Sequence, residues 1–196
     1  THAMELALLT ADLDEGAEII VPTFTYVSSA QAVLRAGATP VFADVDAQNG
    51  MLTPDTVKKA QTENTAGVMM VHYGGFPGNT EQIQHYCENN DLFCLEDAAQ
   101  AYGSRRQGRP AGTVGRFGAI SFHGTKSITC GEGGILILNE EDDVSRTEMI
   151  RDKGTDRSTT RLGDVDRYTW RTIGSSYVHS DILGAILLEQ IRRWPK

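Results

Sequence analysis

The sequence predicts an α/β fold in which a mainly parallel central sheet is covered by helices on both faces. Short apolar runs rich in β-branched residues alternate with amphipathic segments through the first half of the chain. Strands joined by helices pair in parallel, because each helix carries the chain back across the sheet. The 196 residues are enough for one large domain with a substantial core, and no internal repeat or linker divides them.

The first half of the chain holds the alternating elements. Pro22 stops an apolar run, Gly37 follows a helical pattern as its C-cap, and Thr53 with Pro54 begins another helix. The expected order is a helix over residues 3–13, a strand at 18–21, a helix at 26–35, a strand at 40–45, a helix at 54–63, a strand at 68–72, a helix at 80–89 and a strand at 92–96.

After Gln100 the pattern changes to strands without intervening helices. These are expected at residues 102–106, 117–122 and 135–138, separated by glycine-rich turns. A helix over 141–153 follows and ends at Gly154, and residues 155–179 read as a long polar loop that contains Arg157, Arg161, Arg167 and Arg171. A last helix begins at Ser180–Asp181, with an apolar face of Ile182, Leu183, Ile186, Leu187 and Ile191.

Composition excludes several classes of protein. A net charge of −8 without a basic stripe argues against a nucleic-acid partner. The acidic run from Glu140 to Asp143 is expected to be a solvated helix start. Cys87, Cys94 and Cys130 show no CxxC spacing, so no disulfide framework or metal site is expected and a reducing, cytoplasmic location fits. No apolar stretch is long enough for a membrane span.

Lys126 and Asp97 are the candidate catalytic residues. Lys126 follows an apolar strand and precedes a run of glycines, and Asp97 closes the strand at 92–96. Carboxyl ends of parallel strands form the ligand-binding edge of an open sheet. A lysine with a nearby carboxylate suits pyridoxal 5′-phosphate (PLP): the amine holds the aldehyde and the carboxylate keeps the pyridine nitrogen protonated. Taken alone, Lys126 also fits a surface lysine, and Asp97 a cap of a helix starting at Ala98.

Other residues are candidates for binding the cofactor. Gln100 lies three residues after Asp97 and is placed to reach the phenolic oxygen. Thr1 and His2 open the first helix, whose free N–H groups suit a phosphate, and Ser121 offers a further hydroxyl. Tyr26 has an aromatic ring that suits stacking on a planar cofactor, although core packing and simple helix capping explain such residues equally well.

Three more residues remain open between two interpretations. His72 and Tyr73 end a strand before two glycines, where they either face a substrate or, for the histidine, lie buried and satisfied. His123 beside Lys126 has the same ambiguity. Cys130 has no obvious base near it in the sequence, which disfavours a nucleophilic role.

Together these segments resemble the DegT-type sugar aminotransferases, which are PLP enzymes with the fold of aspartate aminotransferase. The resemblance covers nearly the whole chain and is specific. The segments that carry it are Pro22–Ser28, Gly37–Val45, Val71–Gly75, Glu96–Gln100, Ser121–Lys126, Lys153–Ser158, Tyr168–Arg171 and Gly174–Tyr177. The last three look most like the branch that aminates dTDP-linked 4-keto-6-deoxy sugars.

The resemblance implies a role for each candidate. Lys126 would hold the cofactor aldehyde and then shuttle a proton, and Asp97 would pair with the pyridinium nitrogen. Gln100 would meet the phenolic oxygen and Tyr26 would stack on the ring. Phosphate contacts would come from Thr1, the amide of His2, and Ser121. Glutamate would donate the amino group to a nucleotide-linked keto sugar for cell-surface polysaccharide, and the enzyme would be a homodimer.

Two departures from the family pattern are visible. Val178 stands where many relatives have an asparagine that reaches the partner subunit's phosphate, although the dTDP-sugar branch tends to have an apolar residue there. The chain also reads as a fragment: residues 1–180 are expected as a PLP-binding large domain without its N-terminal segment. Residues 181–196 would begin the helix to an absent small domain, so the fragment alone is expected to turn over poorly.

Two rival functions use the same fold. Sugar dehydratases replace the lysine with histidine, so Lys126 disfavours that reaction. A non-catalytic sensor of nucleotide sugars is disfavoured because Lys126, Asp97 and Gln100 are all retained.

Overall fold

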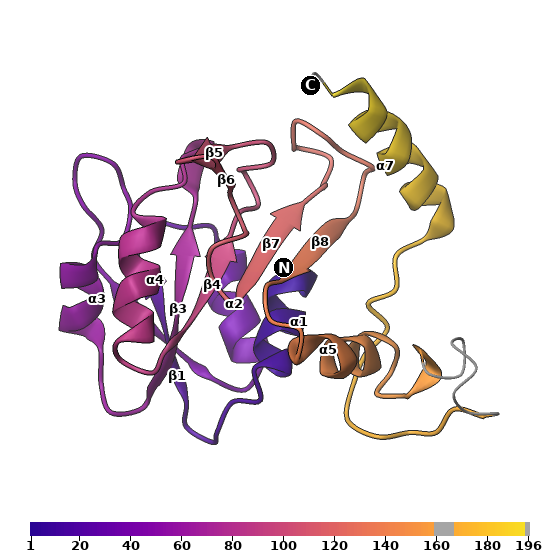
Figure 1. Cartoon of the computed structure of the whole chain (residues 1–196), viewed down its shortest axis with the longest axis horizontal. Coiled ribbons are helices and arrows are strands. Elements are labelled where there is room, and N and C mark those ends of the chain that lie inside the picture. Colours follow the sequence, from indigo (N-terminus) through magenta and orange to yellow (C-terminus); the bar gives the residue numbers. More distant parts are fainter. Residues whose placement is uncertain (159–166, 195–196) are drawn as a thin grey trace.

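A six-stranded sheet lies at the centre of the computed structural model, which describes residues 1–158 and 167–194 (Figure 1). Its strand order is β2-β1-β3-β4-β7-β8; the pairings are parallel except that of β8, which runs antiparallel to β7. The strands are β1 (Glu18–Pro22), β2 (Thr39–Ala43), β3 (Thr65–Val71), β4 (Phe93–Asp97), β7 (Phe117–Ser121) and β8 (Gly134–Leu138). The predicted mainly parallel sheet is confirmed.

The helices follow the predicted order with shorter ends. They are α1 (His2–Thr10), α2 (Val27–Arg35), α3 (Pro54–Ala60), α4 (Thr80–Glu88), α5 (Asp143–Arg151) and α7 (Asp181–Arg193), with a 3-10 turn at Tyr73–Gly75. The first helix stops before residue 13 because Asp12 adopts a φ of 56°, outside the helical region. Among the described helices, none is long and apolar enough to cross a membrane.

The prediction of a strand over 102–106 is wrong for most of its length. Gly103 has a φ of 83°, which turns the chain, and Tyr102 instead packs edge-on against Phe122 with ring centroids 5.6 Å apart. Only Arg105–Arg106 (β5) is extended, and it forms a small antiparallel hairpin with Arg109–Pro110 (β6).

Two hydrophobic cores lie on opposite faces of the sheet, which confirms helices on both sides. Because side chains alternate along a strand, Ile19 faces α1 and α2, and Ile20 faces α3 and α4. Cys87 and Cys94 are buried in the second core, as expected for small core residues.

The last helix packs with only part of its apolar face. Leu183, Leu187 and Ile191 contact a small cluster around Phe122. Ile182 and Ile186 were expected on the same face, but their side chains are exposed.

The predicted helix start at Glu140–Asp143 is solvated except at its last residue. Asp143 is buried and accepts two hydrogen bonds from the Arg116 guanidinium, at 2.6 and 2.8 Å. This bidentate pair joins the start of β7 to α5.

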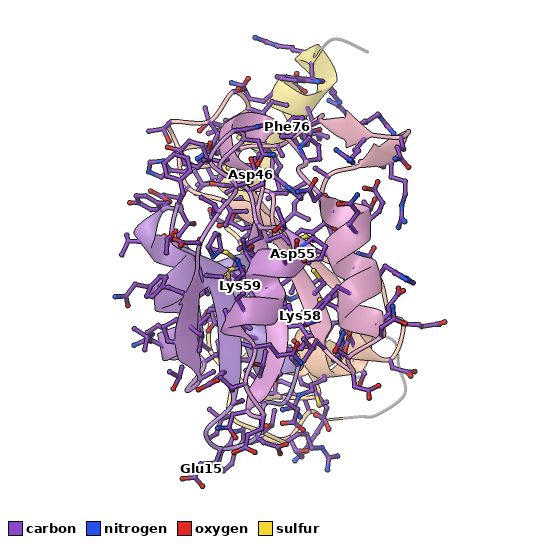
Figure 2. The ribbon with its side chains drawn as sticks, turned by 90° about the vertical axis from the view of Figure 1, so that its left-hand side faces the viewer. Glu15, Asp46, Asp55, Lys58, Lys59 and Phe76 are labelled. Atoms are coloured by element: carbon purple, nitrogen blue, oxygen red, sulfur yellow. The ribbon has the colours of Figure 1, made fainter. Side chains whose placement is uncertain are left out.

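The loops after β2 and β3 emerge at one edge of the sheet. Figure 2 shows Asp46 and Phe76 near that end, with Glu15 at the opposite end and Asp55, Lys58 and Lys59 along α3 between them. The residues that follow β4 and β7 emerge at the same edge, because β4 and β7 run parallel to the first strands.

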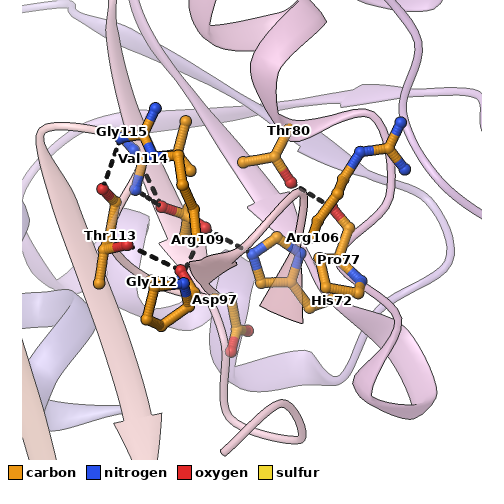
Figure 3. A network of polar contacts seen from close by, with 12 residues as sticks. His72, Pro77, Thr80, Asp97, Arg106, Arg109, Gly112, Thr113, Val114 and Gly115 are labelled. Atoms are coloured by element: carbon orange, nitrogen blue, oxygen red, sulfur yellow. Dashed lines mark hydrogen bonds and ion pairs between the residues drawn. The ribbon is translucent and has the colours of Figure 1, made fainter. Parts of the chain in front are cut away.

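A buried carboxylate organises this edge. Glu96 is fully buried, and its two oxygens accept hydrogen bonds from the ring of His72 (2.7 Å) and from the amides of Gly112 (2.8 Å), Val114 (2.7 Å) and Gly115 (2.9 Å). Figure 3 shows His72 and the 112–115 turn, which supply these donors. Burial alone would raise the pKa of Glu96, but His72 and the amides outweigh it and lower the pKa.

Replacement of Glu96 tests this network. Glu96→Gln puts an amide NH₂ where an oxygen accepted backbone N–H groups, so we expect a loss of about 3 kcal/mol in the free energy of unfolding, measured in urea. Glu88→Gln is the matched control, because Glu88 is exposed, pairs with His85 only at 3.9 Å, and accepts from Gln84 a hydrogen bond that a glutamine oxygen can also accept; it should cost less than about 1 kcal/mol.

The difference in stability between the wild type and Glu96→Gln should also depend on pH. Since the folded pKa of Glu96 lies below its ordinary value of 4.5, its contribution is fully present above that value and is lost as the pH falls through the folded pKa. The stability gap between the wild type and Glu96→Gln should therefore narrow in acid. A gap that stays constant down to the lowest pH at which the wild type folds would contradict the assignment.

Candidate active site

The candidate residues of the sequence converge on the carboxyl edge of the sheet. Asp97 ends β4 and Ser121 ends the neighbouring strand β7. The two strands are in register with Asp97 opposite Ala119, and the amide of Ala98 donates to the Ala119 carbonyl at 2.8 Å. The loop that carries Lys126 therefore begins beside Asp97.

Asp97 is buried with both carboxylate oxygens held. Its side chain is only 6% exposed. Oδ2 accepts a 2.8 Å hydrogen bond from the Ser29 hydroxyl, and Oδ1 accepts one of 3.2 Å from the amide of Ala99. The alternative in which Asp97 caps a helix is wrong, because residues 98–100 form a turn. A carboxylate has about four acceptor positions, so two remain for a ligand.

Lys126 lies half-buried in the loop after β7. Its amide donates to the His123 carbonyl at 2.9 Å, which forms a tight turn. No hydrogen bond or ion pair joins its amine to any residue that the structure describes. Ser121 is half-buried five residues earlier, and its hydroxyl accepts a 3.3 Å hydrogen bond from the amide of His123.

Thr1 and His2 lie at the start of α1, as predicted. Thr1 does not cap the helix with its side chain; its hydroxyl donates to the Ser28 hydroxyl at 2.7 Å. Ser28 directly precedes Ser29, which donates a hydrogen bond to Asp97, so the first turn of α2 contacts both Thr1 and Asp97.

The aromatic residues at this edge are exposed. Tyr26 is the N-cap of α2, and 68% of its surface is accessible, so it does not pack in the core. Two residues earlier, Phe24 packs its ring against that of Tyr73 at a tilt of 36°, with ring centroids 4.2 Å apart. Tyr73 therefore faces the edge, whereas its neighbour His72 is the buried, satisfied histidine of the Glu96 network.

Gln100 is oriented by the glycines that follow His72. Its Oε1 accepts a 2.7 Å hydrogen bond from the amide of Gly74, so its NH₂ group points elsewhere and is available to donate. Gly75 makes this approach possible: it has a φ of 84°, and a Cβ there would lie 2.9 Å from the Gln100 carbonyl oxygen.

Two residues near Lys126 have local partners. His123 is exposed and lies 3.5 Å from a carboxylate oxygen of Glu132. Cys130 is buried, and the fold brings His179 to 3.7 Å from its sulfur, a base that is not apparent in the sequence. Burial raises the pKa of the Cys130 thiol, which agrees with the inert role expected.

The long loop after α5 is anchored to the domain. Tyr177 donates a 2.8 Å hydrogen bond to Glu5 of α1, and its ring lies edge-on to that of His2. Burial, reinforced by Glu5, raises the pKa of Tyr177 to about 12. Asp156 accepts hydrogen bonds from Thr169 and Arg171, and Arg161 lies outside the described residues.

Sequence reasoning did not identify Ser29, Thr25 or Gly74 as parts of this edge. Ser29 is fully buried and lies one helical turn from Ala32 and Val33, which belong to the first core. A serine on an apolar helix face is the signal that could have pointed to it, because a buried hydroxyl needs a partner.

The chain belongs to the DegT/DnrJ/EryC1/StrS aminotransferase family, whose sequence profile matches residues 1–196. A GDP-perosamine synthase from Escherichia coli O157:H7 is 36% identical over 194 residues, which are 98% of this chain and 51% of that protein. The chain thus spans about half the length of that relative.

Solved structures agree with this assignment. An aminotransferase from Psychrobacter cryohalolentis has a TM-score of 0.91 with 32% identity, over 98% of this chain and 50% of the other. The PLP-form of Spr1654 from Streptococcus pneumoniae has a TM-score of 0.87 with 25% identity, over 98% of this chain and 53% of the other. The fold class predicted from the sequence is therefore that of the family.

The contact between Gly75 and Gln100 is tested by two alanine variants. Gly74 and Gly75 both have positive φ, so each alanine carries a backbone cost of roughly 1 kcal/mol. Gly74→Ala meets nothing within 4 Å, whereas Gly75→Ala collides with the backbone of Gln100. We expect Gly75→Ala to lose at least about 1 kcal/mol more of the free energy of unfolding, measured in urea, than Gly74→Ala. Equal losses would show that Gly75 and the Gln100 backbone are not in close contact.

Proposed function

We propose that the complete protein is a PLP-dependent aminotransferase that acts on a nucleotide-linked sugar. The observation that carries this proposal is that Asp97 ends β4 and that Lys126 lies in the loop after the neighbouring parallel strand β7, at the edge where such sheets bind ligands. Membership of the aminotransferase family supports the same reaction class.

The residues at this edge fit PLP part by part. Asp97 offers a fixed carboxylate to the ring nitrogen, and Gln100 offers an oriented NH₂ to the phenolic oxygen. The phosphate would take the Ser121 hydroxyl, Thr1 and the amide of His2, at a helix start that has no side-chain cap. Tyr26 has an exposed ring for stacking.

Each residue has a defined task in the transfer of the amino group. PLP supplies the electron sink when it is bound. Lys126 would hold the cofactor aldehyde, and its free amine would be the base that takes and returns the proton of the substrate carbon. Asp97 would favour a protonated ring nitrogen, because an ionised carboxylate stabilises an adjacent cation.

The substrates follow from the family and the relative. We propose glutamate as donor and a nucleoside-diphosphate-linked 4-keto-6-deoxy sugar as acceptor, in a cytoplasmic homodimer that serves cell-surface polysaccharide synthesis. The name of the E. coli relative favours a GDP-linked sugar, whereas the segments at 153–158 and 168–177 resemble the branch of dTDP-4-amino-4,6-dideoxygalactose transaminase.

Substitution of Lys126 tests the reaction class. In the complete protein, Lys126→Ala should still fold, should lose the visible absorbance that PLP has when joined to a lysine, and should transfer no amino group from glutamate. Lys58→Ala is the matched control, because Lys58 is an exposed lysine on α3. Wild-type absorbance in Lys126→Ala would remove Lys126 from its role.

Asp97→Ala tests the electron sink separately. This variant should keep bound cofactor, because the lysine and phosphate contacts remain, but the half-reaction with glutamate should slow by orders of magnitude. Single-turnover absorbance changes after addition of glutamate measure this rate. An unchanged rate would show that the ring nitrogen does not depend on Asp97.

A comparison of acceptors distinguishes the nucleotides. The protein is first converted with glutamate, and GDP-linked and dTDP-linked 4-keto-6-deoxy sugars are then added separately. Return of the PLP absorbance with only one of them identifies the nucleotide.

A further inference from the structure

The hydroxyl of Ser29 is the only side-chain donor to Asp97 among the described residues. It is fully buried in the first turn of α2 and lies 2.8 Å from Oδ2. We propose that Ser29, supported by Thr25, is a positioning residue that sets the carboxylate of Asp97 for the ring nitrogen of the cofactor. This inference rests on the proposed function.

The number of hydrogens on each group determines which one donates in the hydrogen bonds from Thr25 to Ser29 and from Ser29 to Asp97. An ionised carboxylate only accepts, so the single hydrogen of Ser29 goes to Asp97. The Thr25 hydroxyl lies 2.6 Å from the Ser29 oxygen and must then be the donor of that hydrogen bond; its other acceptor, the Tyr26 carbonyl, is farther away at 3.4 Å. Each bond polarises the next, which makes Ser29 a stronger donor to the carboxylate.

The bond has two physical effects on Asp97. It stabilises the ionised carboxylate in a buried position, where an unpaired charge is costly. It also fixes the plane of the carboxylate, because Oδ1 is held by the amide of Ala99 and Oδ2 by Ser29. Without Ser29 the group keeps one anchor and turns about it.

The neighbouring serine provides a contrast within the same helical turn. Ser28 accepts its hydrogen bond from Thr1, at the other end of the candidate site, and has no recorded contact with Asp97. Ser28→Ala and Ser29→Ala therefore remove the same chemical group from adjacent residues, but only the second should affect the ring nitrogen.

The test uses the complete protein loaded with PLP that carries ¹⁵N in its ring, since the ¹⁵N chemical shift reports whether that nitrogen is protonated. Ser29→Ala should lower the proton affinity of the ring nitrogen about tenfold, the effect of losing one hydrogen bond to a charged group. Thr25→Val should cause a smaller change in the same direction. Ser28→Ala should leave the shift as in the wild type.

Several outcomes would overturn the inference. If the ¹⁵N chemical shifts of both Ser29→Ala and Thr25→Val match those of the wild type across the pH range, neither hydroxyl positions Asp97. An equal change in Ser28→Ala would show a general disturbance of the helix. If Ser29→Ala does not fold, an unchanged shift in Thr25→Val is sufficient to reject it.

Failure of the proposed function has a different signature. The reaction class is wrong if the wild type binds no PLP. It is also wrong if the wild type binds PLP without the visible absorbance of PLP joined to a lysine. Both results are known before any serine variant is measured. A protonated ring nitrogen in the wild type that is unaffected by Ser29→Ala leaves the reaction class intact and removes only the positioning role.

Discussion

The carboxylate of Glu96 is the interaction on which the candidate site depends. A fully buried charge at the end of a central strand is tolerated only when its acceptor positions are filled, and here one histidine and three backbone amides fill them. The amides belong to the turn that leads into β7, and the histidine directly follows β3. Glu96 thereby ties the ends of β3 and β4, at the edge where the site lies, to the segment that enters β7.

Because strand residues alternate between the two faces of the sheet, the buried Glu96 lies next to the candidate residue Asp97 but faces the opposite side. Consecutive residues of a strand face opposite sides of the sheet, so Asp97 faces α2 while Glu96 faces the second core. The amide of His72 also donates to the Asp97 carbonyl at 3.0 Å, which ties the backbone of β3 to that of β4. These contacts therefore fix the backbone from which the Asp97 side chain projects, and Ser29 and the amide of Ala99 orient its carboxylate.

The sequence predicts the order of the elements and the edge that holds the candidate residues, because both depend on local sequence patterns. Apolar runs, prolines and caps determine the order of strands and helices, and parallel pairing brings Asp97, Ser121 and the loop of Lys126 to one edge. The hairpin of β5 and β6 was missed because each strand has only two residues. The link between Ser29 and Asp97 joins residues 68 apart, so no spacing rule reveals it. The contact of Gly74 with Gln100 depends likewise on how two loops meet.

The first turn of α2 shows why tertiary placement matters more than residue type here. A planar cofactor with a phosphate at one end and a ring nitrogen at the other needs both ends held at a fixed separation. Ser28 and Ser29 are adjacent on a helix and therefore project about 100° apart, toward Thr1 and Asp97 respectively. One rigid element thus contacts both Thr1 and Asp97, and a cofactor bound between them, as we propose, would meet groups that are already oriented.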